Sequence, residues 1–416
     1  MHIKHFRMTL VAAAVAAATT GANAEGFLPG RIGSADGVVE AVTGVDINET
    51  QFMKSLGLTA GGWVDFGYTH NFNNPRNNLN TPLTFNWRDD RVLLNQINVF
   101  VERAVDAGGD SWDIGGRVDF MYGSDSPFTQ AVGLEISDGG KQKWVGNTSD
   151  PMNNINKMAL PQAYLEVYAP IFNGITAKLG HFYTIIGNEV VTAPDNFFYS
   201  HAYTMQYGEP FTHTGALFTT PIMDNLSITV GAVNGWDSLT WDIDDAWSFI
   251  GGLNWENGVE GAGALSLALT AITGAANGTN GDDDRSLYSI VLGYDITDNF
   301  HFTLQHDHGW QEMPGTDNVA HWYGINGYLT YDINDMFAVG TRMEWFRDED
   351  GVRVPTSVAG KSTNFYEMTA GINITPVKWF KVRPEFRYDW AENTRPYDDN
   401  NSRNQFVFAV DAIVMF

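Results

Sequence analysis

Three histidines and an aspartate in one stretch are the residues of this chain best suited to transition-metal chemistry. They are His301, His306, Asp307 and His308, and imidazole and carboxylate groups are ordinary zinc ligands. If the stretch is an extended strand, His306 and His308 point to one face, whereas His301 and Asp307 point to the other. We therefore predict no metal site here and interpret His306 and His308 as residues at the boundary between membrane and water.

Other candidate sites also lack the spacing that their chemistry needs. The acidic run Asp282–Asp284 offers oxygen ligands, but it lacks the spaced 1-3-5-12 pattern of an EF-hand, so a solvated acidic loop is favoured. Neither G-x-S-x-G nor H-E-x-x-H occurs. We predict no catalytic residue, no metal and no cofactor. A hydrolase site assembled from distant strands stays a less favoured alternative.

Charged residues instead recur at every second position. In 111–122 the odd positions carry Asp113, Arg117 and Asp119, while the even positions are apolar apart from Gly116. In 379–390 a charged face alternates with an apolar one in the same way. Because side chains of a strand alternate between two faces, this pattern is typical of a strand between lipid and a wet lumen.

Repeats of this pattern predict the fold. We identify sixteen segments, and fourteen or eighteen would also be compatible: 57–70, 92–106, 111–122, 160–169, 174–184, 212–221, 225–235, 245–255, 262–273, 285–296, 299–310, 319–332, 335–347, 362–374, 378–390 and 403–416. Polarity contrast is lowest in 174–184, 212–221 and 262–273. The connections alternate between long and short. We therefore predict an all-β fold, a transmembrane antiparallel up-and-down β-barrel of about 16 strands, with short periplasmic turns and long extracellular loops.

The N-terminus has the parts of a secretory signal. Lys4 and Arg7 precede a short apolar stretch, and Ala22-Asn23-Ala24 fits a cleavage site. The apolar stretch is too short to cross a bilayer as a helix. We predict a cleaved signal peptide at 1–24, a pre-barrel segment at 25–56 and the transmembrane β-barrel at 57–416. The pre-barrel segment is too short for a plug domain and is either a periplasmic tail or a segment in the lumen.

Composition excludes several classes of protein. The chain has a formal net charge of −25 and no cysteine. An acidic chain is unsuited to neutralising phosphates, so no nucleic acid is expected as a partner. The lack of cysteine excludes disulfides, cysteine-bound zinc and iron–sulfur clusters.

The last strand carries a candidate assembly signal. Its apolar positions alternate and end on the aromatic residue Phe416, which resembles the terminal signal of outer-membrane barrels. We predict that Phe416 is recognised by the barrel-assembly machinery. The other expected partners are outer-membrane lipid and small hydrophilic solutes or ions. The sequence does not determine the oligomeric state, and a homotrimer is compatible with it.

Several motifs resemble those of a known family. They are Leu179-Gly180-His181-Phe182-Tyr183-Thr184, Gly187-Asn188-Glu189, Asn196-Phe197-Phe198-Tyr199-Ser200-His201, His213-Thr214-Gly215, Asn234-Gly235-Trp236-Asp237 and Val382-Arg383-Pro384-Glu385-Phe386-Arg387-Tyr388-Asp389. In residues 160–237 and 380–416 the chain resembles the OmpL-like outer-membrane β-barrel porins. The resemblance implies a porin. Loop 123–159 matches none of these motifs, and its role stays open.

Inward-facing charges and one aromatic loop are the candidate functional residues. The predicted pore-lining residues are Asp65, Asp113, Arg117, Asp119, Glu166, Arg342, Glu344, Lys381, Arg383, Glu385, Arg387 and Asp389. Loop 185–211 is rich in aromatic residues, which are poorly suited to exposure in water, so we predict that it folds into the bore. The predicted constriction residues are Glu189, Asp195, Phe197, Phe198 and Tyr199.

These features predict an outer-membrane porin of a Gram-negative-type cell. We expect a water-filled channel for the passive diffusion of small hydrophilic solutes or ions. A weak cation preference is expected because acids outnumber bases along the predicted bore. The basic ladder of Lys381, Arg383 and Arg387 would reverse that preference if it lined the constriction. The main alternative is a receptor, adhesin or scaffold barrel without an open pore.

Overall fold

A computed structural model describes most of the chain. The described residues are 34–137, 140–141, 143–144, 155–239, 247–275, 284–313 and 315–416. The predicted signal peptide and the acidic residues Asp282 and Asp283 lie outside them. No helix within the described ranges is both long and apolar enough to cross a membrane.

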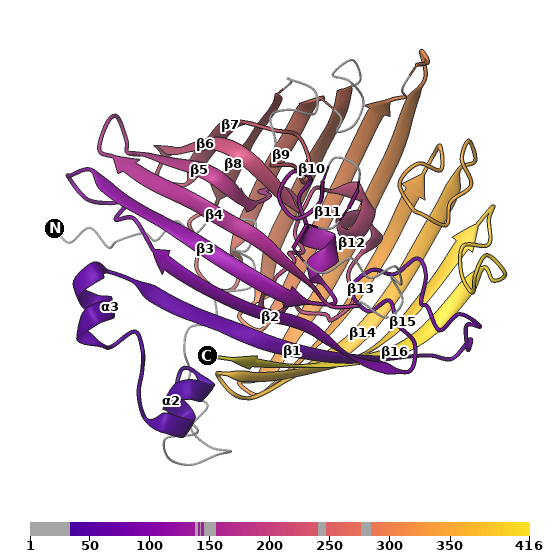
Figure 1. Cartoon of the computed structure of the whole chain (residues 1–416), viewed down its shortest axis with the longest axis horizontal. Helices are drawn as coiled ribbons and strands as arrows, with labels where there is room; N and C mark the ends of the chain where they lie inside the picture. Colours follow the sequence, from indigo (N-terminus) through magenta and orange to yellow (C-terminus); the bar gives the residue numbers. More distant parts are fainter. Residues whose placement is uncertain are drawn as a thin grey trace.

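The described chain forms one closed, antiparallel β-barrel (Figure 1). Its strands are β1 (Thr59–Asn71), β2 (Arg91–Arg103), β3 (Asp113–Gly123), β4 (Lys157–Ala169), β5 (Ile175–Tyr183), β6 (Thr212–Met223), β7 (Leu226–Val233), β8 (Ser248–Glu256), β9 (Leu265–Ala275), β10 (Asp284–Thr297), β11 (Phe300–Glu312), β12 (Val319–Asn334), β13 (Phe337–Asp348), β14 (Thr363–Val377), β15 (Phe380–Glu392) and β16 (Asn404–Met415). Each strand pairs with its neighbours in sequence, and β1 pairs with β16, with Phe66 opposite Ala412. The predicted sixteen-strand barrel is confirmed.

Burial separates the two faces of each strand. On β3 the side chains of Ile114 and Phe120 are exposed in the isolated chain, whereas Asp119 is buried. On β15, Phe386 is exposed and Arg387 is buried. The exposed apolar side chains form the lipid face, and the buried ones point into the barrel. The period of two in the sequence therefore predicts correctly which residues face inward on these strands.

Turn length differs between the two ends of the barrel. Only residues 335–336 separate β12 from β13, and only 298–299 separate β10 from β11. At the other end, residues 184–211 connect β5 to β6 and residues 72–90 connect β1 to β2. This alternation of short turns and long loops is typical of bacterial outer-membrane barrels.

Two short helices precede the barrel, α2 (Val38–Thr43) and α3 (Gln51–Leu56). The Thr50 hydroxyl accepts a hydrogen bond from the Met53 amide and begins α3, and Gly57 ends it with a φ of 63°. The helices lie at the short-turn end, with α2 beside the C-terminus (Figure 1). There Lys378, in the turn between β14 and β15, donates to Asp36 at 2.8 Å.

An apolar cluster fills part of the barrel interior. Its wall residues include Leu217 on β6, Val233 on β7, Ile250 on β8, Ile272 on β9 and Leu287 on β10. The loops add Leu83, Ile185, Ile186, Tyr203, Trp236, Val354 and Tyr397. Strands β6 and β9 therefore have apolar residues on both faces, which explains their low polarity contrast in the sequence.

Candidate functional site

The loop 184–211 enters the barrel and is fixed to the strand wall. It contains η2 (Ala193–Asp195) and the short π-helix η3 (Thr204–Gly208). Its residues Phe198, Tyr199 and Tyr203 are almost fully buried. A loop with this burial must satisfy its backbone groups internally, and side chains of β13 and β15 supply most of its partners.

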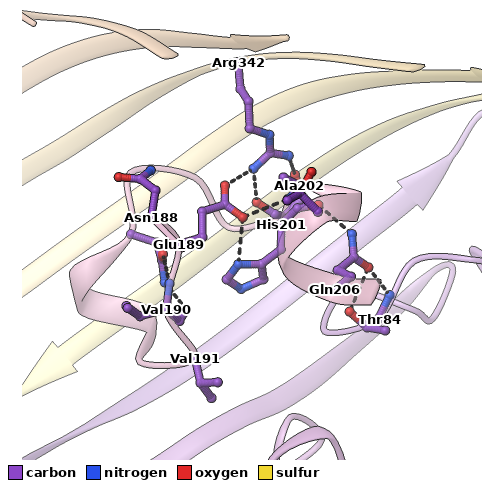
Figure 2. A network of polar contacts seen from close by, with 12 residues as sticks. Thr84, Asn188, Glu189, Val190, Val191, His201, Ala202, Gln206 and Arg342 are labelled. Atoms are coloured by element: carbon purple, nitrogen blue, oxygen red, sulfur yellow. Dashed lines mark hydrogen bonds and ion pairs between the residues drawn. The ribbon is translucent and has the colours of Figure 1, made fainter. Parts of the chain in front are cut away.

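Arg342 of β13 is the centre of this attachment. Its Nη1 atom donates to Glu189 Oε1 at 2.6 Å and to the Ser200 carbonyl at 2.7 Å, and its Nε atom donates to Glu367 Oε1 at 2.5 Å. Figure 2 shows the guanidinium reaching from the wall to Glu189. All three charged side chains are buried. A guanidinium placed between two carboxylates fixes the position of the loop more tightly than a single pair would.

Glu189 also orders its own loop. Its Oε2 atom accepts a hydrogen bond from the Ala202 amide at 2.8 Å and lies 3.3 Å from His201 Nδ1 (Figure 2). Burial by itself would raise the pKa of Glu189, but Arg342 and His201 outweigh burial and lower the pKa to about 2. Glu189 is therefore an anion at all ordinary pH values.

The basic ladder on β15 donates to loop carbonyls. Arg383 Nη1 reaches the carbonyls of Ala193 at 2.8 Å and Asn196 at 2.6 Å, while its opposite edge pairs with Asp411. Arg387 Nη1 donates to the His201 carbonyl at 2.5 Å, and Lys381 Nζ donates to the Pro194 carbonyl at 2.9 Å. These cations therefore lie beneath the loop and hold it.

Carboxylates of the same wall accept the loop amides. Glu385 accepts from the amides of Tyr199 at 2.9 Å and Ser200 at 3.1 Å. Glu344 accepts from the amide of Thr204 at 2.7 Å and from its hydroxyl at 2.6 Å. Glu385 thus satisfies two donors that are buried away from water, and Glu344 satisfies three, because it also accepts from the Tyr203 amide.

The loop 72–90, which connects β1 to β2, covers the other side of loop 184–211. Gln206 Oε1 accepts from the amide and the hydroxyl of Thr84, both at 2.7 Å, and Gln206 Nε2 donates to the His201 carbonyl at 2.6 Å (Figure 2). Thr84 and Gln206 are not among the residues predicted from the sequence. Neither residue carries a charge or an aromatic ring, so no local signal marks them.

Small residues in the wall make room for the loop. An added Cβ atom on Gly324 would lie 2.1 Å from Thr204 Oγ1, and one on Gly340 would lie 2.5 Å from the Phe197 ring. An added Cβ on Gly67 would lie 2.2 Å from the Tyr199 hydroxyl. Inward-facing glycines in strands indicate a close approach of another segment, and this signal is visible in the sequence.

The remaining constriction residues stabilise the loop internally. Asp195 accepts from the Thr192 hydroxyl at 2.5 Å. The Phe197 and Phe198 rings pack with their centroids 4.9 Å apart, and Phe198 also lies below the Arg342 guanidinium.

Two further predicted pore-lining residues lie on the wall. Asp389 pairs with Arg387. Asp65 accepts from Asn95, which also accepts from the Tyr199 hydroxyl.

Another set of predicted pore-lining residues lies apart from the loop attachment, nearer the short-turn end. Arg117 Nε donates to Asp119 Oδ1 at 2.6 Å, and Arg117 Nη1 lies 3.2 Å from Glu102. Asp113 pairs with Arg103 at 2.8 Å, and Glu166 is opposite Lys178 in the β4–β5 register. Arg117 and Glu102 are partly exposed, with side-chain exposures of 19% and 29%, so these charges contact water in the lumen.

The C-terminal residue closes the barrel. The amide of Phe416 donates to the Gly62 carbonyl at 2.9 Å, and the Gly62 amide donates back to the Phe416 carbonyl at 3.0 Å. Phe416 thus extends the pairing of β16 with β1 at the short-turn end.

The histidine-rich stretch does not converge on one point. His306 lies 3.2 Å from the Tyr288 hydroxyl, and His308 stacks on Tyr323 with centroids 4.5 Å apart. His301 pairs with Asp295 on the other face. A separate group, not predicted from the sequence, is His70, Asp89 and Asp90, whose ligand atoms lie within 4.8 Å of one another. The Asp89 and Asp90 oxygens already accept hydrogen bonds from the Asn71 amide and the Tyr68 hydroxyl.

A closed barrel with long loops at one end and a loop folded inside defines an outer-membrane channel architecture. Residues 57–416 match the family model of beta-barrel porin-2, OmpL-like. The chain therefore belongs to this family of outer-membrane β-barrel porins. No curated protein sequence matches it.

Solved porin structures share the fold at low sequence identity. The anion-selective porin from Comamonas acidovorans matches with a TM-score of 0.54 and 10% identity, covering 86% of this chain and 99% of that one. The trimer form of OmpT from Vibrio cholerae has a TM-score of 0.53 at 12% identity, covering 86% and 99%. OprB of Pseudomonas putida has a TM-score of 0.53 at 11% identity, covering 89% and 97%. At such identities the likeness shows the fold alone.

Proposed function

We propose that this porin is a passive diffusion channel for small hydrophilic solutes or ions, constricted by the loop 184–211, with a weak preference for cations and no enzymatic activity. The observation that carries the proposal is the attachment of this loop to the inner wall of a sixteen-strand barrel. A barrel of this size is wide enough to hold water, and a loop inside it determines which solutes pass.

The attachment supports a cation preference. Arg342, Arg383 and Arg387 are paired with carboxylates or loop carbonyls and are almost fully buried. Arg383 and Arg387 of the basic ladder therefore contribute little free positive charge to the passage. The chain as a whole carries 49 acids and 24 bases, and an excess of acids around a narrow opening concentrates cations there.

The reversal potential across a salt gradient tests the selectivity. We expect cation preference near 0.1 M KCl, where the Debye length is about 10 Å, and a weaker preference near 1 M, where it is about 3 Å. Anion preference at low salt would contradict the proposal.

A closed barrel that serves as a receptor, adhesin or scaffold is the second candidate. The observation that favours it is the apolar cluster inside the barrel. This cluster joins residues of β5 to β10 and of β12 to β16 to five loops. Planar-bilayer recordings with purified protein separate the two candidates, because only the channel gives discrete conductance steps.

We also propose a homotrimer, as in the trimer form of OmpT from Vibrio cholerae. Crosslinking of the membrane-embedded protein would show the number of subunits.

A further inference from the structure

The segment that precedes the barrel exposes five large apolar side chains. They lie between α2 and the end of α3 and are Val42, Val45, Ile47, Phe52 and Leu56. Val42 and Phe52 are the most exposed of them, at 69% and 66%. Single exposed apolar residues are ordinary, but such a concentration in one short segment marks a surface that contacts a membrane or another protein.

Helix α3 separates apolar from charged side chains. Phe52 and Leu56 are four residues apart, so they lie on one face of the helix, whereas Lys54 lies on the opposite side. Met53 is buried, so the helix rests on the protein through Met53 and leaves Phe52 and Leu56 outside. Lys54 is exposed and pairs with Glu49. The helix therefore presents an apolar strip on one side and a charge on the other.

Hydrogen bonds fix this segment to the rim of the barrel wall. Asn48 Oδ1 accepts from the Ala60 amide at 2.8 Å, and Asn48 Nδ2 donates to the Ala60 carbonyl at 3.0 Å. Ala60 lies on β1 just beyond Gly62, which is paired with the last residue, Phe416. Asn48 thus takes the place that a further residue of β16 would occupy. Figure 1 shows α2 and α3 beyond the outline of the barrel at this end.

The same rim belongs to the lipid face of the barrel. Ala60 is opposite Val101 of β2, which is opposite Val118 of β3, and both valines are exposed on the lipid face. Directly opposite residues lie on the same face of a sheet, so Ala60 faces lipid as well. At its other end the segment approaches Phe416, because an added Cβ atom on Gly37 would lie 3.1 Å from the Phe416 Cα atom. The exposed apolar segment therefore continues the lipid face at the short-turn end.

We propose that residues 38–56 form an anchor on the periplasmic leaflet of the outer membrane, with Val42, Phe52 and Leu56 inserted into the lipid. Interfacial helices bury their apolar face about 5–10 Å into the boundary between headgroups and acyl chains. A helix of six residues would bind lipid weakly by itself, but the covalent link to β1 and the bonds of Asn48 hold it at the surface. The inference goes beyond the proposed channel, because it holds whether or not the barrel conducts.

Apolar contact, and not charge, carries this attachment. Lys54 is the only base between residues 34 and 58, and acidic residues such as Glu40 and Asp46 are not attracted to anionic lipid. The anchoring should therefore be independent of salt. A protein partner would cover the same side chains without bringing them into contact with lipid, and the experiment separates these two cases.

Depth-dependent fluorescence quenching tests the anchor. The chain has no cysteine, so Phe52→Cys accepts a single NBD label on the apolar strip. The folded full-length barrel is inserted into vesicles of phosphatidylethanolamine and phosphatidylglycerol, with or without a phospholipid that carries a nitroxide near the headgroup end of its acyl chain. A label that lies about 5–10 Å deep is surrounded by this quencher and should lose about half of its emission or more.

Lys54→Cys is the matched control, because it places the label on the opposite side of the same helix and removes only an exposed ion pair. It should lose little emission, whereas Val42→Cys should be quenched like Phe52→Cys. The heat-dependent shift in gel mobility checks that every labelled variant is folded. Absence of quenching at Phe52 or Val42, equal quenching at Lys54, or loss of quenching when KCl is raised to about 1 M would overturn the proposal.

Discussion

The two sides of the lumen hold the inner loop by different physics. The side built from β13 to β16 presents buried charges, such as Arg342, Glu344 and Arg383, which bond to loop backbone groups. The side built from β6 to β10 presents apolar residues, such as Leu217, Ile272 and Leu287, which belong to the interior cluster. The interior cluster also includes Phe346 of β13 and Phe365 of β14, so the two sides differ in their buried charges. We call the side built from β13 to β16 the polar wall and the side built from β6 to β10 the apolar wall.

The difference shows what each kind of contact contributes. Hydrogen bonds are directional, so the polar wall determines where each loop residue lies. The hydrophobic effect is non-directional and proportional to the apolar area removed from water. The apolar wall therefore contributes free energy of folding without fixing the register of the loop. We expect substitutions on the two walls to differ in kind as well as in size.

Arg342→Met should have the largest effect. It leaves Glu189 and Glu367 as buried anions without their shared partner, which is expected to lower the free energy of unfolding by about 3–5 kcal/mol. Loop 184–211 should then become accessible to protease and single-channel conductance should rise. Arg347→Met removes the partly exposed pair with Glu349 and should cost about 1 kcal/mol or less. Similar losses in both variants would contradict a special role of the polar wall.

Leu287→Ala tests the apolar wall. The Leu287 side chain is buried in the interior cluster, so its truncation should destabilise the barrel by about 2–5 kcal/mol in urea titrations. Because the hydrogen bonds of the polar wall remain, protease accessibility of the loop should stay unchanged in the native state. Leu292 lies on the lipid face of the same strand and serves as the control, with a smaller expected loss for Leu292→Ala. If Leu287→Ala releases the loop, the division between the two walls fails.

Gly324→Ala should have the smallest effect of the three. Its Cβ atom would lie 2.1 Å from Thr204 Oγ1, so Thr204 must move away from Glu344, at a cost of about 1–3 kcal/mol. Gly327→Ala on the same strand is the control, because the nearest atoms to its Cβ are 3.8 Å away. Midpoints of thermal unfolding should differ between the two variants. Equal midpoints would mean that Thr204 has room to adjust.

Sequence periodicity determined the architecture of this protein. Alternation of faces and of loop length predicted the strands, with bounds that differ from those observed by a few residues at most, as with 160–169 against Lys157–Ala169. These properties are local, because a strand's two faces and a turn's length are written in neighbouring residues. The aromatic loop was also recognisable from its composition, since rings such as Phe198 and Tyr203 are unsuited to water.

Tertiary structure decided which charges meet. Arg342 and Glu189 are 153 positions apart, and their contact depends on how the closed barrel places β13 opposite a loop that follows β5. The sequence shows that Lys381, Arg383 and Arg387 point inward, but not that loop carbonyls accept hydrogen bonds from them. The low polarity contrast of β6 and β9 indicates apolar residues on their inward faces, but the sequence does not show that these residues pack in one cluster with the loops. Periodicity specifies the face of a residue, whereas its partner follows only from barrel closure and loop packing.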